Sequence, residues 1–317
     1  MKIRVSYGTA ICLGLLQASQ DVEPTTAYLL YDTGCIGKCS FCSRANGNER
    51  SAKLSRIIWP EYDFETVLER LTAEPRPFSH ICLQTGYNPN TEHLVKELAI
   101  KLVNTGLSVS MTLSPSQPAL TIEMLNEGID HVGIGLDAAT PEGYGKHKRK
   151  DWEKDWPNLK NTMQLVPSKI EVHLIFGLDE SEEDFMYRIQ EIVDSKGKIS
   201  LFAFTPVNGG NSPSMGAYRR VQIFRYLCEG GKLRYEECKF EKGQLNSVGI
   251  QGEELIKALD NGDAFRTSGC NKCNRPYYNE RPGQEFYNFP RPLSDVEFKQ
   301  ALLRSKLFFD DSFLPNK

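Results

Sequence analysis

The sequence lacks the long apolar runs that membrane spans require. No stretch reaches the roughly 18 consecutive apolar residues of a transmembrane helix. The apolar run near the start, Ala10–Leu16, is short, is interrupted by Gly14 and leads into the polar segment Gln17–Gln20. A secretory signal would need a longer apolar core and a small-residue cleavage site. We therefore expect neither a membrane segment nor a secretory signal.

The sequence also lacks a strong excess of charge of either sign. It has 38 Lys and Arg against 41 Asp and Glu, a net charge of −3. This balance does not indicate a polycation that binds nucleic acid. The nine cysteines are odd in number and unevenly spaced, which favours metal ligation in a reducing compartment over a disulfide framework. We expect a cytoplasmic protein with no nucleic-acid partner.

Short apolar runs alternate with amphipathic stretches of helical period over residues 27–204. Six strands are expected, at Ala27–Tyr31, His80–Leu83, Ser108–Thr112, His131–Leu136, Glu171–Phe176 and Leu201–Phe204. The helices are expected at Asp63–Thr72, Thr91–Asn104, Thr121–Glu127, Trp152–Val166 and Glu182–Asp194. Such alternation predicts a parallel sheet covered by helices. Since six units are fewer than the eight of a closed barrel, we expect an α/β fold, a partial (βα)6 TIM-like barrel with its active site at the strand C-termini.

The alternation stops near residue 229, and Gly, Pro, Asn and charged residues become more frequent beyond it. We therefore divide the chain into two parts. Residues 1–229 are predicted to form an N-terminal segment and the partial barrel. Residues 230–317 are predicted to form a loop-rich C-terminal extension that carries a second cysteine pair.

Three cysteines follow the first predicted strand on one short loop. Cys35, Cys39 and Cys42 have the spacing C-x3-C-x2-C, with glycines at 34 and 37 to relieve backbone strain. Three thiolates suit three corners of a cubane cluster, whereas a structural zinc would require a fourth ligand nearby. The fourth iron would stay open for another ligand, and a zinc loop is the alternative.

This loop, with Phe41 before its last cysteine, resembles the radical S-adenosylmethionine (SAM) superfamily. The resemblance implies that Cys35, Cys39 and Cys42 hold a 4Fe–4S cluster. It also implies that the amine and carboxylate of S-adenosylmethionine chelate the open iron. An electron from the cluster then cleaves this cofactor to methionine and a 5′-deoxyadenosyl radical.

Other positions resemble the cofactor-binding residues of that superfamily. The loop after the second strand matches the segment that contacts the amino group of the cofactor, and its residues are Gln84, Thr85, Gly86 and Asn88. Asp137, after the fourth strand, matches a polar group directed toward the cofactor. The alternative is that these are ordinary loop residues.

A second pair of cysteines, Cys270 and Cys273, forms a Cys-x2-Cys turn that can direct two thiolates at one metal centre. Two ligands are an incomplete site, and Cys82, Cys12 and the hydroxyl of Ser268 are candidates to complete it. Cys82 is favoured because strand ends face the barrel cavity. Its segment also resembles one in biotin synthase, where a cysteine holds an auxiliary cluster. The remaining cysteines, Cys228 and Cys238, are expected to be structural.

The chain as a whole resembles the biotin-synthase-related radical proteins, in particular the subunits of the two-component lipoyl synthase. The segments that carry the resemblance are Arg4-Val-Ser, Leu54–Pro60, His173–Asp179, Leu201–Pro206, Tyr218-Arg-Arg and Cys270–Pro282. The single-chain lipoyl synthase has a further N-terminal cysteine motif, but residues 1–27 here contain only Cys12. Close kinship with the single-chain enzyme is therefore excluded.

This resemblance implies one of the two sulfur insertions of lipoyl cofactor biosynthesis. Hydrogen is abstracted from an unactivated methylene of an octanoyl chain on a carrier-protein lysine, and an auxiliary iron–sulfur cluster supplies the sulfur. The implied partners are an octanoylated lipoyl-carrier protein or peptide, a second radical SAM lipoyl synthase subunit, and an electron donor such as ferredoxin or flavodoxin.

Two alternatives stay open from the sequence. A radical SAM enzyme could abstract hydrogen without inserting sulfur, with Cys270 and Cys273 holding a structural or electron-relay metal. From a different class, the chain could be a non-catalytic iron–sulfur scaffold or a zinc-binding module.

Several other residues have both a structural and a functional interpretation. Arg275, Glu280 and Arg281 flank the second pair and could orient a substrate or ligate a cluster. His173 is expected to be a core residue. The basic run 146–150 is expected to be a solvated loop, which could dock an acidic carrier domain.

Overall fold

The computed structural model describes residues 1–45, 52–206, 210–250, 252–259, 261–271, 273–280 and 283–307. Six parallel strands lie side by side in sequence order: β2 (Ala27–Tyr31), β6 (His80–Thr85), β7 (Ser108–Leu113), β8 (His131–Asp137), β9 (Ile170–Phe176) and β10 (Lys198–Ala203). The strand order is linear, so the sheet is open. The expected partial barrel of six β/α units is confirmed.

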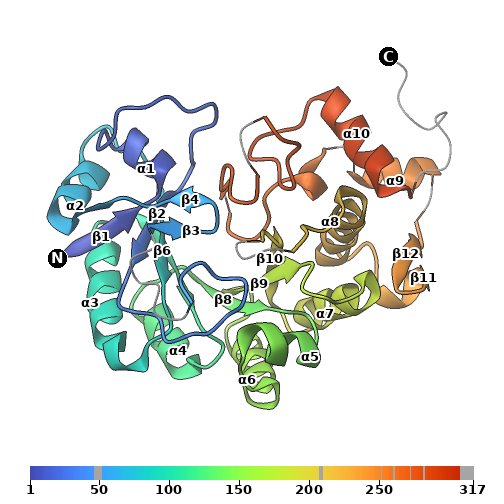
Figure 1. The fold of residues 1–317 in the computed structure, drawn as a ribbon, viewed down its shortest axis with the longest axis horizontal. Helices are drawn as coiled ribbons and strands as arrows, with labels where there is room; N and C mark the ends of the chain where they lie inside the picture. Colours follow the sequence, from blue (N-terminus) through green and yellow to red (C-terminus); the bar gives the residue numbers. More distant parts are fainter. Residues whose placement is uncertain are drawn as a thin grey trace.

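The connecting helices are α2 (Phe64–Thr72), α3 (Glu92–Val103), α4 (Pro118–Asn126), α6 (Trp152–Leu165), α7 (Glu182–Asp194) and α8 (Met215–Glu229). Figure 1 shows α3, α4, α6 and α7 along the outer side of the curved sheet. Two boundaries were predicted too late. The helix expected at Thr121 begins at Pro118, because proline is suited to the first helical turn. The strand expected at Leu201 begins at Lys198, because polar Ser200 interrupts its apolar pattern.

Two short strands that the sequence pattern did not reveal extend the sheet beyond β2. β1 (Lys2–Val5) pairs antiparallel with β2, and β5 (Glu61–Asp63) pairs antiparallel with β1. The short helix α1 (Tyr7–Cys12) and the hairpin β3 (Lys53–Leu54) and β4 (Ile57–Ile58) lie in the same region. No helix within the described ranges is both long and apolar enough to cross a membrane.

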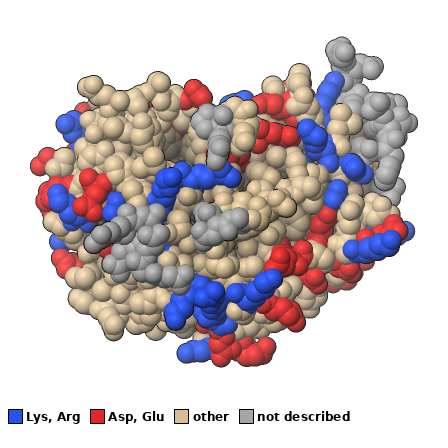
Figure 2. All heavy atoms as spheres, in the orientation of Figure 1, with Lys and Arg blue, Asp and Glu red and all other residues tan. Residues whose placement is uncertain are grey.

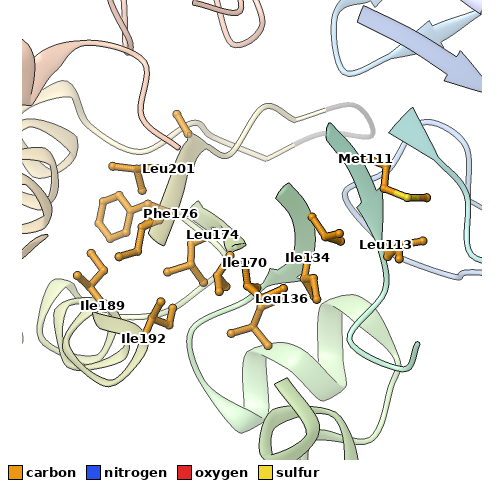
Figure 3. Packing of buried hydrophobic residues seen from close by; sticks show 14 of the residues in the cluster. Met111, Leu113, Ile134, Leu136, Ile170, Leu174, Phe176, Ile189, Ile192 and Leu201 are labelled. Carbon is orange, nitrogen blue, oxygen red and sulfur yellow. The ribbon is translucent and has the colours of Figure 1, made fainter. Parts of the chain in front are cut away.

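The two faces of the barrel strands differ in chemistry. Along β9, Leu174 and Phe176 are buried on the outer face, where they pack toward Ile189 and Ile192 of α7 (Figure 3). Since side chains alternate between faces, Glu171 and His173 point to the inner face. The interior of the barrel therefore carries polar groups, and apolar packing against the helices stabilises the sheet from outside.

The C-terminal extension contains β11 (Lys239–Glu241), β12 (Gln244–Ser247), α9 (Gly252–Leu259) and α10 (Asp295–Ser305). It packs beside α8 and β10 (Figure 1). The buried Arg219 of α8 anchors it, because its guanidinium donates to the carbonyl oxygens of Phe286 and Tyr287. Short 3-10 helical turns lie at Tyr235–Glu237 and Asp263–Phe265 in the extension and at Pro89–Thr91 in the barrel.

Replacing Arg219 should therefore loosen the extension. We expect Arg219→Met to lower the free energy of unfolding by about 3 kcal/mol, because buried carbonyl groups lose their charged donor. Urea unfolding followed by circular dichroism measures the change. The control Arg234→Met removes only exposed ion pairs with Asp194 and Glu236, and its midpoint should stay at the wild-type value. Equal midpoints for both variants would contradict the anchoring role.

Candidate functional site

The loop that carries Cys35, Cys39 and Cys42 leaves the C-terminal end of β2 and packs on the loop after β6. Ile36 donates its backbone N–H to the carbonyl of Tyr87 at 3.0 Å. The amide of Asn88 donates to the carbonyl of Thr33 at 3.1 Å. A Cβ at Gly86 would lie 2.9 Å from the Cβ of Cys35, so this close approach requires glycine. The structure thus brings the predicted cofactor loop against the first cysteine.

Two of the three thiols, those of Cys35 and Cys39, lie beside a cradle left by Gly37. A Cβ there would lie 3.2 Å from the Cys35 sulfur and 3.9 Å from the Cys39 sulfur, and the Gly37 N–H donates to the Cys35 sulfur at 3.4 Å. Burial raises the pKa of Cys39, and it raises the pKa of Cys42 to about 11. A bound metal reverses this effect because it deprotonates the thiols that coordinate it. The sulfur donors and the glycine cradle fit a 4Fe–4S cluster.

Within the described residues, no three His, Cys, Asp or Glu side chains converge closely enough to hold a single metal ion. A cubane makes a different demand, because each thiolate binds a separate iron atom and the sulfurs stand further apart. Thiols that do not meet at one point can therefore still hold separate iron atoms of one cluster.

Asp137 lies at the end of β8 and forms a buried ion pair. Its Oδ2 is 2.6 Å from the Nζ of Lys148, which also donates to the carbonyl of Gly135 at 2.5 Å. Burial alone would lower the pKa of Lys148, but the charges of Asp137 and Cys39 raise it above its usual value. The ammonium group thus stays charged close to the first cysteine loop.

This ion pair corrects the interpretation of residues 146–150 as a solvated loop. They continue from α5 (Pro141–Gly143) as a π-helical turn over Tyr144–Lys148, and Lys148 is only 7% exposed. Lys150 donates to the Ser114 hydroxyl at 2.6 Å and lies 3.8 Å from the centre of the Tyr87 ring. The sequence pattern shows only that the run is basic. The structure buries Lys148 and leaves Lys146 and Arg149 exposed.

The second group of cysteines assembles inside the barrel. Cys82 on β6 and Cys273 belong to one buried cluster with Tyr28, and Cys270 packs against it. The Tyr28 hydroxyl is 3.2 Å from the Cys273 sulfur. The structure thus brings Cys82 to the two C-terminal cysteines, as the sequence favoured.

Electrostatic interactions link these three thiols. Burial, together with the nearby Cys273, raises the pKa of Cys82 to about 12. The hydrogen bond with the Cys270 thiol and the charge of Arg275 lower the pKa of Cys273, although burial opposes them. Cys273 is therefore the readiest of the three to act as a thiolate ligand.

A cavity of about 1090 Å³ opens onto these cysteines. Its wall includes Cys82, Cys270, Cys273 and Trp59. A smaller cavity of about 130 Å³ is lined by Cys42 and Asp137. The two cavities share wall residues, which are Ser43, Ser55, His173, Phe202 and Tyr278. Cys42 and the second cysteine group thus line adjoining cavities inside the barrel.

His173 was expected to be a core residue, but it lines both cavities. A Cβ at Gly133 would lie 2.5 Å from its Nε2, so the glycine on β8 makes room for the ring. Burial lowers the pKa of His173 to about 4, which keeps the imidazole neutral. Tyr278, which sequence reasoning missed, lies in the same shared wall. A hydrophobic pattern could not reveal either residue, because it does not show which strand face borders a cavity.

Several predicted candidates lie elsewhere or have other partners. Gln84 donates to the Cys82 sulfur at 2.9 Å, so it faces the second cysteine group. Thr85 is bonded to Thr112 of β7 through both its N–H and its hydroxyl. Cys12 is bonded by Gln20 and lies outside the buried cysteine cluster.

The Ser268 hydroxyl accepts from the backbone N–H of Leu201 at 2.9 Å, so it holds the C-terminal segment to β10. The carboxylate of Glu280 accepts from the N–H groups of Tyr287 and Asn288, which is a structural role. Arg281 lies outside the described residues.

The two remaining cysteines lie away from the site. Cys228 packs in the apolar core on α8, and Cys238 precedes β11. Neither contributes to the wall of the large cavity. Their positions agree with the structural roles expected for them.

Comparison with solved structures shows a shared fold. The chain is similar to a methylornithine synthase (PylB), with 15% identity and a TM-score of 0.51, over 74% of this chain and 67% of that one. It is also similar to HydG, a maturase of the FeFe-hydrogenase, with 11% identity and a TM-score of 0.52, over 64% of this chain and 50% of that one. A search of curated proteins found no match.

The family model "Radical SAM superfamily" matches residues 31–192. This range begins at the end of β2, includes the three-cysteine loop and ends in α7. The chain therefore belongs to the radical SAM superfamily of enzymes, and this membership implies a 4Fe–4S cluster and S-adenosylmethionine as its cofactors.

Proposed function

We propose that this enzyme inserts sulfur into an unactivated C–H bond of a protein-bound octanoyl chain, as one of the two insertions of lipoyl cofactor biosynthesis. One observation carries the proposal: Cys82, Cys270 and Cys273 meet inside the barrel, beside the cavity that adjoins the first cysteine loop. A cluster held there could supply sulfur directly to a carbon radical formed in the cavity, and for this reason we favour sulfur insertion over hydrogen abstraction with an electron-relay metal. We propose that these three thiolates hold an auxiliary iron–sulfur cluster that serves as the sulfur source.

When bound, the two clusters and the cofactor supply chemistry that side chains lack. The first cluster with its cofactor would supply the radical that takes a hydrogen atom from an octanoyl methylene, and the auxiliary cluster would supply the sulfur atom and accept one electron. Cys35, Cys39 and Cys42 would hold the first cluster. Gly86 and Asn88 pack against the loop of Cys35, Asp137 lines the small cavity beside Cys42, and we propose that they contact the cofactor.

The large cavity suits an alkyl chain. Its wall contains Phe202, Trp59, Ile57 and Tyr278. Such apolar walls bury methylene groups favourably and exclude water from a carbon radical. A chain bound in this cavity would lie beside the second cysteine group and next to the smaller cavity that Cys42 lines, and such proximity would lower the barrier to carbon–sulfur bond formation.

The proposed macromolecular partners are an octanoylated carrier protein or peptide, a second radical SAM lipoyl synthase subunit, and ferredoxin or flavodoxin as electron donor. An acidic carrier would be attracted by exposed basic side chains. Lys146 and Arg149 are exposed beside the first cysteine loop. Figure 2 shows Lys and Arg side chains gathered over the region of α5 and α6.

Removing one auxiliary thiol should separate radical formation from sulfur transfer. We expect the reconstituted wild-type enzyme to hold about eight irons per chain and Cys82→Ala to hold about four. Given S-adenosylmethionine, a strong reductant and an octanoyl-lysyl peptide, Cys82→Ala should still form 5′-deoxyadenosine but should add no sulfur. Mass spectrometry of the peptide measures the addition.

The matched control for this test is Cys238→Ala, which removes a thiol far from the cavity and should retain both iron and sulfur transfer. If the wild-type enzyme, assayed with a candidate partner subunit, adds no sulfur while it forms 5′-deoxyadenosine, the function is hydrogen abstraction alone.

A second prediction concerns the cofactor. Asp137→Asn should weaken binding of S-adenosylmethionine about tenfold, because a charge-assisted hydrogen bond is lost. Equilibrium dialysis with the cluster-loaded protein measures the dissociation constant without turnover. The control Asp179→Asn removes an exposed carboxylate that pairs with Lys146 and His147, and it should bind the cofactor normally. Unchanged binding by Asp137→Asn would exclude this residue from the cofactor site.

A further inference from the structure

A carboxylate is buried directly beside the second cysteine group. Glu171 is the second residue of β9 and is only 1% exposed. Its Oε2 accepts a hydrogen bond from the Cys270 sulfur at 2.7 Å. Its Oε1 is buried and has no hydrogen-bond partner among the described residues. A buried carboxylate with a free oxygen is uncommon in a folded protein, and it indicates a missing partner.

The hydrogen bond to Cys270 cannot persist once this cysteine binds a metal, because ligation removes the thiol proton. Glu171 would then have both oxygens free beside a thiolate. An uncompensated buried charge is strongly destabilising. A metal atom at this position would supply the positive charge that both groups need.

Tyr28 and Arg275 beside the cysteines already have partners, and the unpartnered indole N–H of Trp59 in the same cluster is a donor that cannot bind a metal. The Tyr28 hydroxyl contacts Cys273 and also accepts from the backbone N–H of Arg275 at 2.9 Å. The Arg275 guanidinium donates to the Ser268 carbonyl at 2.7 Å and stacks over Phe202. Glu171 differs from them because it has an open acceptor oxygen.

We propose that Glu171 is the fourth protein ligand of the auxiliary cluster, completing a site of three thiolates and one carboxylate. This inference rests on the auxiliary cluster of the proposed function and adds to it the ligand that the sequence left open. Glu171, Cys82 and the C-terminal pair come from three separate elements. Only the folded barrel brings them together.

This ligand set has a chemical consequence. Thiolates are soft donors that bind iron tightly, whereas a carboxylate is a hard donor that exchanges more readily. The iron atom bound to Glu171 would therefore differ from the other three in its electronic environment. It would also be the corner from which the cluster opens most readily.

The test isolates the auxiliary cluster in a parent variant with Cys35→Ala, Cys39→Ala and Cys42→Ala. After anaerobic reconstitution with ⁵⁷Fe and sulfide, we expect about four irons per chain. Mössbauer spectra should then resolve one iron site with a higher isomer shift than the other three. Adding Glu171→Cys should retain the iron and abolish this distinct site.

Adding Glu171→Gln preserves the side-chain shape but weakens the ligand. We expect a chelator to remove iron about tenfold faster from this variant than from the parent. The matched control is Glu180→Gln, which alters a half-buried glutamate with one buried, unpartnered oxygen just beyond the other end of β9. Its spectrum and its iron release should equal those of the parent. Circular dichroism verifies that each variant is folded.

The outcomes distinguish this inference from the proposed function. One outcome is that the parent holds about four irons while the Glu171→Gln variant has the same spectrum and the same iron release as the parent. In that case Glu171 is not a ligand, but the proposal of an auxiliary cluster is retained. If the folded parent binds no iron, the auxiliary cluster is overturned and its fourth ligand with it.

Discussion

The close contact between Gly269 and Ser200 determines where the C-terminal cysteine pair lies relative to the barrel strands. Gly269 has φ +100, and a Cβ at this position would overlap the Ser200 side chain on β10. Only glycine permits both this backbone conformation and this approach. The neighbouring Ser268 hydroxyl holds the same segment to β10 by accepting from Leu201. Together these contacts direct Cys270 into the barrel, where it reaches a strand that lies far away in sequence.

The barrel has a polar interior because side chains alternate between the two faces of each strand. The outer faces are apolar and pack against the helices, and this packing stabilises the sheet from outside. Cys82, Glu171 and His173 can therefore occupy inward positions that an ordinary core would fill with aliphatic residues. Their burial in a small space strengthens the electrostatic coupling between them.

Sequence patterns predicted the repeating part of the fold because strand–helix alternation is a local signal. They missed β1 and β5, because these short edge strands are defined by their pairing and not by their own pattern. The spacing of Cys35, Cys39 and Cys42 similarly revealed one site, since its ligands share a loop. The pairing of Lys148 with Asp137 was not predictable in this way, because burial of a lysine depends on how a helical turn packs. Glu171 also escaped sequence reasoning, since a glutamate in a strand is ordinarily assigned to the solvent face.

The anchoring of the extension by Arg219 has a consequence for assembly. Cys270 and Cys273 belong to the extension, whereas Cys82 belongs to the barrel sheet. Regions with fewer buried contacts can open locally while the rest of a protein stays folded. If the extension opens in this way, two cysteines leave and the third stays fixed on β6. Iron and sulfide could then enter, or a spent centre be rebuilt, without unfolding the sheet that holds the radical-generating loop.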